Sequence, residues 1–399
     1  MAAQNNNTNV MASHDTIALK APKRLVPQLR FKEFDGEWNE KTLKEVTKIN
    51  QGLQIAIADR YLEPIENAHF YITNEFLKEG STKKYYILNP PESVLCEEKD
   101  ILMTRTGNTG QVVTGVKGAF HNNFFKIKFD SHVDKDFLFF FLNSHRTQHT
   151  ILKLAGTSTI PDLNHGDFYR IKINLPSLPE QQKIAQFLTA VDSKLQQLNQ
   201  KKELLEQYKK GVMQQLFSQQ LRFKQDNGSD YPNWEEKKLG DVSYITTGSS
   251  NRVDSSLDGE YTFFDRSEDI RTSSIYLFDD EAVIVPGEGQ DFIPKYFIGK
   301  FDLHQRTYAI MKFENCLGKF IYYHLVQHPN YLLSQSVGST VKSLRLPMFK
   351  KMKINFPSTE EQQKIASYLS AIDTKIATVT QQIEATQQFK KGLLQQMFV

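Results

Sequence analysis

The sequence predicts an α+β fold in which two strand-rich mixed α/β domains are separated by two long helices. Three observations support this prediction. Much of the chain is written twice, each copy ends in a long run of apolar residues at helical spacing, and the interior of each copy contains short strand-like runs. The 399 residues leave room for two or three domains of ~100–200 residues each.

The internal repeat is clearest in Glu180–Ala185, which recurs as Glu361–Ala366. Near the start of each copy, the spacing of apolar residues and glycine in Leu43–Gly52 recurs in Leu239–Gly248. The first match has an offset of 181 residues and the second an offset of 196, so the second copy has lost residues in its interior. We call these repeated outer parts of each copy the frame.

The interiors of the two copies, about residues 53–155 and 249–336, share almost no identity. Both are rich in aromatic residues and contain strand-like runs bounded by Gly, Asn and Pro. Any duplicated protein drifts, but drift would erode frame and interior alike. The contrast therefore indicates that the frame interacts with one common partner and the interiors with two different ones.

The two long helices begin at prolines, Pro176 and Pro179 for the first and Pro357 for the second, and proline is tolerated in the first turn of a helix. Each spans close to forty residues and would be on the order of 55 Å long at ~1.5 Å per residue. A long helix that exposes an apolar face to water is not stable alone. We therefore expect the two helices to pair as an antiparallel coiled coil with pseudo-two-fold symmetry. The apolar seam consists of Ile184, Leu188, Val191, Leu195, Leu198, Leu205, Val212 and Leu216 in the first helix, and Ile365, Leu369, Ile372, Ile376, Val379, Ile383, Leu393 and Met397 in the second.

These patterns predict five segments. They are a disordered N-terminal tail at 1–26, which contains the polar run Gln4–Asn9, a first domain at 27–175, a central helix at 176–219, a second domain at 220–356 and a C-terminal helix at 357–399.

Composition excludes several classes of protein. No stretch approaches the ~18 apolar residues that a membrane helix requires, and the first residues lack a signal-type apolar core, so we expect a cytoplasmic protein. Cys96 and Cys316 are too few for a disulfide framework or a metal cluster, and we expect both to be reduced and buried. The net charge of +3 provides no global basic field of the kind that many DNA-binding proteins carry.

Three motifs imitate catalytic sites. Asn89–Glu92 is close to an amino-methyltransferase motif, but Glu92 stands where an aromatic residue would stack on a flipped base. Asp162 and Asp192 imitate a nuclease metal site, but Asp192 lies in a predicted helix. Gly107–Gly110 lacks the Lys-Ser/Thr of a phosphate-binding loop. We therefore predict no catalytic residue and no metal site in this chain.

The motifs at Pro176–Ala185 and Pro357–Ala366, together with the strand and turn at Asp100–Gly107, resemble the specificity subunits of Type I restriction-modification systems. The resemblance extends from Pro27 to Val399. It implies a non-catalytic subunit in which each target-recognition domain binds one half of a split double-stranded DNA site.

The resemblance also implies partners and cofactors. Two modification (methyltransferase) subunits would dock on the helices and restriction subunits would join them. The complex would use S-adenosylmethionine, with ATP and Mg²⁺ for restriction, and this chain would hold no cofactor. The candidate positions for the helix seam and partner docking are Ile184, Leu188, Val191, Leu195, Leu198, Ile365, Leu369, Ile372, Ile376 and Val379.

The candidate DNA-binding residues are polar residues in turns, and basic residues of the second domain. Arginine pairs with guanine and asparagine with adenine, whereas serine and threonine often bind phosphates. For each of them a solvated surface residue, or one that closes a turn, is the alternative. The candidates are Arg105, Thr106, Asn108, Thr109, Ser158, Thr159 and Asn164 in the first domain, and Arg266, Arg271, Arg306, Lys342 and Arg345 in the second. The second domain has Val285–Gly289 where the first has Thr104–Gly107, so Arg105 lacks a counterpart.

Two other functions compete with DNA recognition. A self-sufficient nuclease or methyltransferase would need an acidic metal site or a cofactor loop. A protein-only coiled-coil scaffold would dock proteins on both domains, and salt-dependent binding to duplex DNA in the presence of the methyltransferase partner would distinguish it.

Overall fold

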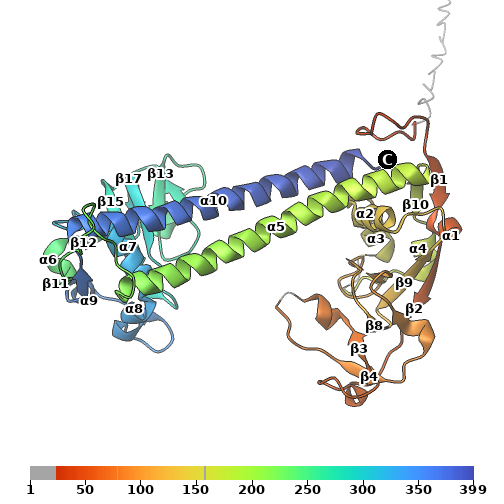
Figure 1. Ribbon diagram of the computed structural model, residues 1–399, viewed down its shortest axis with the longest axis horizontal. Helices are drawn as coiled ribbons and strands as arrows, with labels where there is room; N and C mark the ends of the chain where they lie inside the picture. Colours follow the sequence, from red (N-terminus) through yellow and green to blue (C-terminus); the bar gives the residue numbers. More distant parts are fainter. Residues whose placement is uncertain (1–23, 79, 157–158) are drawn as a thin grey trace, which may run out of the picture. The chain divides into compact units, whose positions relative to one another are not determined.

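The structure is a computed structural model that describes residues 24–78, 80–156 and 159–399 (Figure 1). The described chain divides into two compact units, one made of residues up to Leu195 together with Ala385–Val399, the other of Gln196–Glu384. Helices α5 (Leu178–Phe217) and α10 (Thr359–Gln396) contribute residues to both units. Most of the predicted N-terminal tail, residues 1–23, lies outside the described residues.

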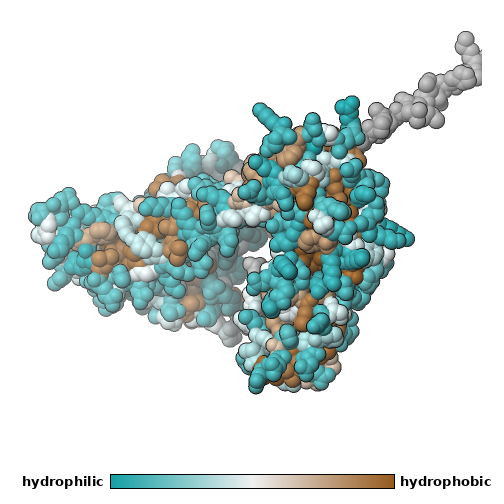
Figure 2. All heavy atoms as spheres, turned by 45° about the vertical axis from the view of Figure 1, so that its right-hand side comes forward, coloured by the Kyte–Doolittle hydropathy of each residue, from teal (hydrophilic) through white to brown (hydrophobic). Residues whose placement is uncertain are grey.

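The first unit contains two four-stranded sheets, with strand orders β2-β9-β6-β7 and β4-β3-β8-β5, and the antiparallel ribbon β1-β10. Hydrophilic residues cover most of its visible surface, with smaller hydrophobic areas between them (Figure 2). Its elements before α5 are β1 (Asn39–Thr42), α1 (Leu43–Val46), β2 (Thr47–Gln51), η1 (Ile57–Asp59), β3 (Ala68–Ile72), η2 (Asn74–Leu77), β4 (Tyr86–Leu88), η3 (Glu92–Val94), β5 (Leu95–Cys96), β6 (Ile101–Thr104), β7 (Val112–Val113), β8 (Gly118–Phe120), β9 (Phe124–Phe129), α2 (Lys135–Asn143), α3 (His145–Ala155), α4 (His165–Tyr169) and β10 (Lys172–Leu175).

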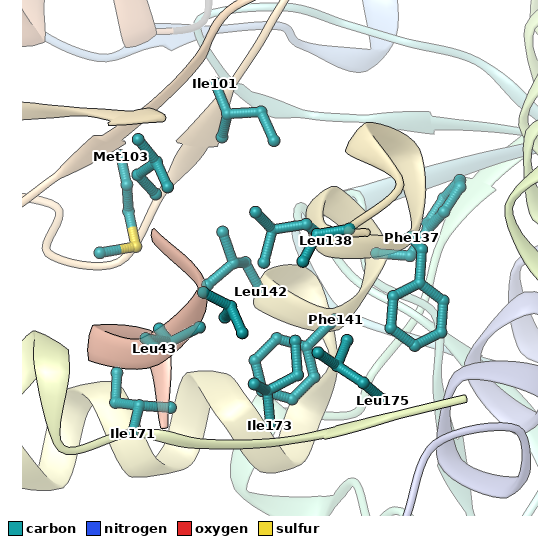
Figure 3. Close-up of a cluster of buried hydrophobic side chains, with 14 of the residues drawn as sticks. Leu43, Ile101, Met103, Phe137, Leu138, Phe141, Leu142, Ile171, Ile173 and Leu175 are labelled. Atoms are coloured by element: carbon teal, nitrogen blue, oxygen red, sulfur yellow. The ribbon is translucent and has the colours of Figure 1, made fainter. Parts of the chain in front are cut away.

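The main core of the first unit lies between β6, α1, α2 and β10 (Figure 3). Leu138 and Leu142 lie on the side of α2 that faces Leu43 and Ile101, whereas the ring of Phe137 packs against Trp38. All of these α2 side chains, like Leu43 and Ile101, are fully buried. The same cluster includes the start of α5 and the end of α10, so burial of this core also holds both helix ends.

The second unit contains a six-stranded sheet, with strand order β12-β18-β15-β17-β13-β14, and the two ribbons β11-β20 and β16-β19. Its elements besides the two long helices are β11 (Glu235–Lys238), α6 (Leu239–Val242), β12 (Tyr244–Thr247), η4 (Arg252–Asp254), β13 (Tyr261–Phe264), β14 (Arg271–Ser273), β15 (Phe278–Pro286), β16 (Glu288–Gly289), β17 (Lys295–Leu303), β18 (Thr307–Met311), α7 (Gly318–Gln327), α8 (Pro329–Gln335), β19 (Lys342–Ser343), α9 (Leu346–Lys350) and β20 (Lys353–Phe356).

The interiors of the two units share strand pairings although their sequences do not match. Strand β3 pairs with β8 in parallel, with Ile72 opposite Phe120, and β13 pairs with β17 in the same way, with Phe264 opposite Leu303. A Cβ added at Gly52 would collide with the carbonyl oxygen of Phe120. The matched glycine of the second unit, Gly248, stands in the same relation to Leu303.

A buried glutamate ties the start of each long helix to the opening segment of its own unit. Glu180 is 2% exposed and accepts hydrogen bonds from Nε and Nη2 of Arg30, both at 2.7 Å, and from the Trp38 indole at 3.3 Å. We call this arrangement, Arg and Trp on a buried Glu, the glutamate clamp.

The second unit has the same clamp. Glu361 is 0% exposed and accepts from Nε and Nη2 of Arg222 at 3.1 and 2.6 Å, and from the Trp234 indole at 3.2 Å. The glutamine that follows each glutamate is also buried. Gln181 and Gln362 cap backbone groups of the segment before the helix, donating to the carbonyls of Pro176 and Pro357 at 3.0 and 2.9 Å.

Within each unit the start of one long helix packs against the end of the other. In the first unit Asp192 pairs with Lys390 at 2.5 Å, and in the second unit Asp373 pairs with Lys209 at 2.6 Å. The helices therefore run antiparallel, and the predicted fold class is confirmed. The predicted seam positions are buried, apart from the half-buried Leu195, Leu205 and Ile376. Among the described residues, no helix has the length and apolar composition of a membrane span.

The first prediction concerns the clamp of the second unit. Arg222→Ala should lower the free energy of unfolding by about 2–4 kcal/mol, because it leaves the Glu361 carboxylate buried without a cation. Urea denaturation followed by tryptophan fluorescence measures it, since the chain's only two tryptophans, Trp38 and Trp234, each belong to a clamp.

The matched control is Arg170→Ala. This arginine also pairs with a carboxylate, that of Asp167, but its side chain is 78% exposed. An exposed pair contributes little, so this variant should stay within about 0.5 kcal/mol of the parent. Equal losses of unfolding free energy in the two variants would show that the clamp stabilises the unit no more than an exposed ion pair does.

Candidate nucleic-acid interface

In the first unit a polar turn follows β6 and is fastened to the segment before α4. Arg105 donates from Nε and Nη2 to the two carboxylate oxygens of Asp162, at 3.1 and 2.7 Å, and the Thr106 hydroxyl donates to the same carboxylate. Burial alone would raise the pKa of Asp162, but the hydrogen bonds from Thr106 and Arg105 outweigh it and hold that pKa below its ordinary value.

Other predicted residues close or border this turn. The buried Thr109 hydroxyl donates to the carbonyls of Pro161 at 2.6 Å and Arg105 at 3.0 Å. Asn108 has a φ of 50° and an exposed side chain, and Asn164 caps α4 by accepting from the Asp167 amide at 2.9 Å. Thr159 is exposed, and Ser158 lies outside the described residues.

In the second unit the matching turn carries the opposite charge. Glu288 accepts from Nη1 of Arg306 at 2.9 and 3.0 Å and from Nη1 of Arg266 at 2.7 Å. Its side chain is 19% exposed, whereas those of Arg266 and Arg306 are 48% and 58% exposed. Burial alone would raise the pKa of Glu288, but the two arginines lower it overall.

Backbone hydrogen bonds establish that the two turns match. The amide of Leu163 donates to Arg105 O at 2.9 Å, and the amide of Leu344 donates to Gly287 O at 2.8 Å. Gly287 therefore stands where the first unit has Arg105. A Cβ at Gly287 would lie 2.6 Å from the carbonyl oxygen of Arg306, so a side chain does not fit there.

The remaining basic candidates lie around or beside this turn. Lys342 is on β19, directly opposite Gly289 of β16, and the exposed Arg345 follows two residues after that strand. Arg271 lies on the edge strand β14 and forms no ion pair among the described residues. The structure thus brings Arg266, Arg306 and Lys342 to one place.

The sequence analysis missed the two carboxylates that organise these turns. Asp162 was considered only as a false metal ligand, and Glu288 only as part of the segment Val285–Gly289 that stands where the first domain has Thr104–Gly107. Acidic residues are not expected at a DNA surface. The one signal in the sequence that could have indicated a role for Glu288 was its position in the turn that aligns with Thr104–Gly107.

Next to each turn, a histidine side chain accepts a hydrogen bond from a backbone amide. Nδ1 of His121 accepts from the Asn123 amide at 3.1 Å, and Nδ1 of His304 accepts from the Arg306 amide at 3.0 Å. Burial, with a contribution from the positive charge of Arg60, lowers the pKa of His121 to about 4, and burial also lowers the pKa of His304. Both rings are therefore neutral at pH 7 and keep Nδ1 free as an acceptor.

The residues that suggested chemistry have structural surroundings. Cys96 and Cys316 are buried and unpaired, and burial raises the pKa of each thiol to about 11. Among residues 24–78, 80–156 and 159–399, no group of three or more His, Cys, Asp or Glu side chains could hold a metal ion.

Comparison with known proteins identifies the family. The model described as the Type I restriction modification DNA specificity domain matches residues 35–207 and again residues 231–387. The chain therefore belongs to this family of DNA specificity proteins, with two copies of its domain.

Individual relatives agree with this assignment. The Type I restriction enzyme MjaVIII specificity subunit of Methanocaldococcus jannaschii is 25% identical over 416 residues, covering 91% of this chain and 94% of that protein. The EcoDI specificity subunit of Escherichia coli is 30% identical over 164 residues, covering 41% and 36%. The crystal structure of a Type I restriction-modification S subunit from M. genitalium shares the fold, with a TM-score of 0.65 at 16% identity, covering 94% of this chain and 99% of that one.

The second prediction concerns pH. The pKa of His121 is lower in the folded protein, about 4, than in the unfolded chain, where it is about 6.5. The folded state then binds fewer protons, so the contribution of His121 to stability is complete above pH 6.5 and is lost as pH falls toward 4. His121→Asn retains an acceptor that cannot be protonated, and it should flatten the pH dependence of the urea midpoint in this window.

Carboxylates also titrate at low pH, so a histidine control is needed. His149→Asn replaces an exposed histidine on α3 and should leave the slope of the parent protein unchanged. If His121→Asn and the parent lose stability equally between pH 6.5 and 4, His121 is not the group responsible.

Proposed function

We propose that this chain is the DNA sequence-recognition subunit of a Type I restriction-modification complex, and that each unit recognises one half of a bipartite duplex site. The observation that carries this proposal is the pair of matched turns. Two units with one backbone design present a half-buried arginine at one turn and a half-buried glutamate at the other. Such a difference suits two different base sequences and has no use if both units bind the same ligand.

The helices offer two equivalent surfaces for a common partner. Tyr208 of the second unit and Phe389 of the first occupy matching positions of the repeat, and they are 51% and 54% exposed. Most seam side chains are buried, so a partner must use exposed positions such as these. Two equal aromatic positions support docking of two copies of one modification subunit, which restriction subunits then join.

The chemistry of the complex belongs, in this proposal, to the partner subunits, which would use S-adenosylmethionine, ATP and Mg²⁺. The motifs of this chain that imitate catalytic sites are accounted for structurally. Asp162 is bound by Arg105 and Thr106, and Asp192 by Lys390. Asn89 has a φ of 48°, as expected of a turn residue. The assembled complex would act on DNA in the cytoplasm.

The third prediction tests this function. The purified chain with S-adenosylmethionine should leave duplex DNA unmethylated and uncut, and addition of the modification subunit should produce methylation at a two-block site. Replacing residues 53–155 by the equivalent segment of a relative should change one block and keep the other, because the clamps and the long helices α5 and α10 are untouched.

Sequencing the methylated sites of the parent and the exchanged protein measures both outcomes. Methylation by the chain alone would identify a self-sufficient enzyme. Assembly with the modification subunit without any salt-dependent affinity for duplex DNA would identify a protein-only scaffold. A change in both blocks after one exchange would refute independent recognition by the two units.

A further inference from the structure

The arginines of the two matched turns use different edges of their guanidinium groups. Arg105 donates from Nε and Nη2, so Asp162 occupies the side-on pair of N–H groups. Arg306 contacts Glu288 through Nη1 alone, and so does Arg266. Among the described residues, Nε and Nη2 of Arg306 and of Arg266 make no hydrogen bond. In the second unit the side-on edge therefore remains free.

A free side-on edge on a fixed guanidinium is suited to guanine. Two parallel N–H groups match the O6 and N7 acceptors of guanine in the major groove, which is the commonest base-specific contact of arginine. The Arg306 side chain is 58% exposed, so the edge is accessible to solvent, and both oxygens of Glu288 restrict its orientation.

A phosphate is a poorer fit than a base at this position. The same N–H pair also suits a phosphate, but the Glu288 carboxylate within 3.0 Å of Arg306 offsets one of the positive charges gathered there and weakens the attraction for a second anion. The edge of a guanine carries no net charge and loses less by this. The carboxylate thus favours a base contact over a backbone contact.

We infer that Arg306 recognises a guanine in the half-site bound by the second unit, and that Glu288 is the residue that positions it. This inference rests on the proposed function, because it assigns a base to one of the two recognition surfaces. Arg105, at the corresponding turn of the first unit, is held by Asp162 and leaves its half-site without this contact. The two blocks of the site therefore differ at their matching positions.

The test uses the complex of this chain with its modification subunit and a pool of duplexes with two randomised blocks. Methylated duplexes are sequenced, and the preference for each base is measured at each position. Arg306→Lys retains the positive charge but lacks the paired N–H edge. At one position of one block, it should reduce the preference for guanine by about tenfold to a hundredfold. The other block should be unchanged.

Glu288→Gln tests the positioning role. It removes the charge that holds both arginines, so the preference for guanine at the same position should fall. Binding to unrelated duplex should stay equal or become tighter, because a negative charge has been removed. If the role of Glu288 were purely structural, Glu288→Gln would instead lower the urea midpoint and weaken binding to all duplexes equally.

The matched control is Arg170→Ala in the first unit, which removes an exposed arginine that also contacts a carboxylate through Nη1, at 3.1 Å. It should leave the guanine preference intact. The inference is overturned if Arg306→Lys keeps the preference, or if Arg306→Lys and Arg306→Ala weaken binding to all duplexes equally, as for a phosphate contact. If the parent complex selects no two-block site, the proposed function itself fails.

Discussion

The glutamate clamp is the interaction on which the rest of each unit depends. Moving a carboxylate out of water costs several kcal/mol. For Glu180 and Glu361 this cost is offset by two hydrogen bonds from one arginine and by a tryptophan indole N–H. Each glutamate lies in the first turn of its helix, where the helix dipole also favours a negative charge. The clamp joins the opening segment of a unit to its long helix and involves no residue of the variable interior. This link between opening segment and helix therefore does not depend on the sequence of the interior.

What the interiors share is backbone geometry. The parallel strand pairs and the histidine next to each turn recur, and the frame glycines Gly52 and Gly248 pack closely against them, whereas most side chains differ. Since the turn is held by main-chain hydrogen bonds at Arg105 and Gly287, its side chains are free to reverse their charges. One backbone design can thus present an anion-bound arginine in one copy and an arginine-bound carboxylate in the other.

The frame could be predicted from the sequence because its contacts depend on side-chain identity. A repeated Glu-Gln-Gln and a repeated seam produced helices predicted at 176–219 and 357–399, and the structure has them at Leu178–Phe217 and Thr359–Gln396. The common topology of the interiors could not be predicted, since main-chain pairings leave little trace in sequence. Arg105 was correctly singled out as part of a polar turn, but its partner Asp162 lies 57 residues away and no local pattern connects them. Glu288 gathers Arg266 and Arg306 from separate strand ends, a grouping that only folding creates.

At the proposed DNA-binding surface, a carboxylate next to the arginines would weaken non-specific attraction, and that loss would have a use. A free arginine side chain carries about 2 kcal/mol of rotamer entropy, which is lost when it is fixed on a base. Where Glu288 already restricts Arg306, part of that loss occurs on folding, so less of it opposes binding. The carboxylate also cancels part of the field that would draw the two arginines to any phosphate. Both effects increase the difference between the right duplex and a wrong one at the expense of total affinity. That exchange would suit the proposed recognition subunit, which would have to find one site among many and would gain further affinity from its partners.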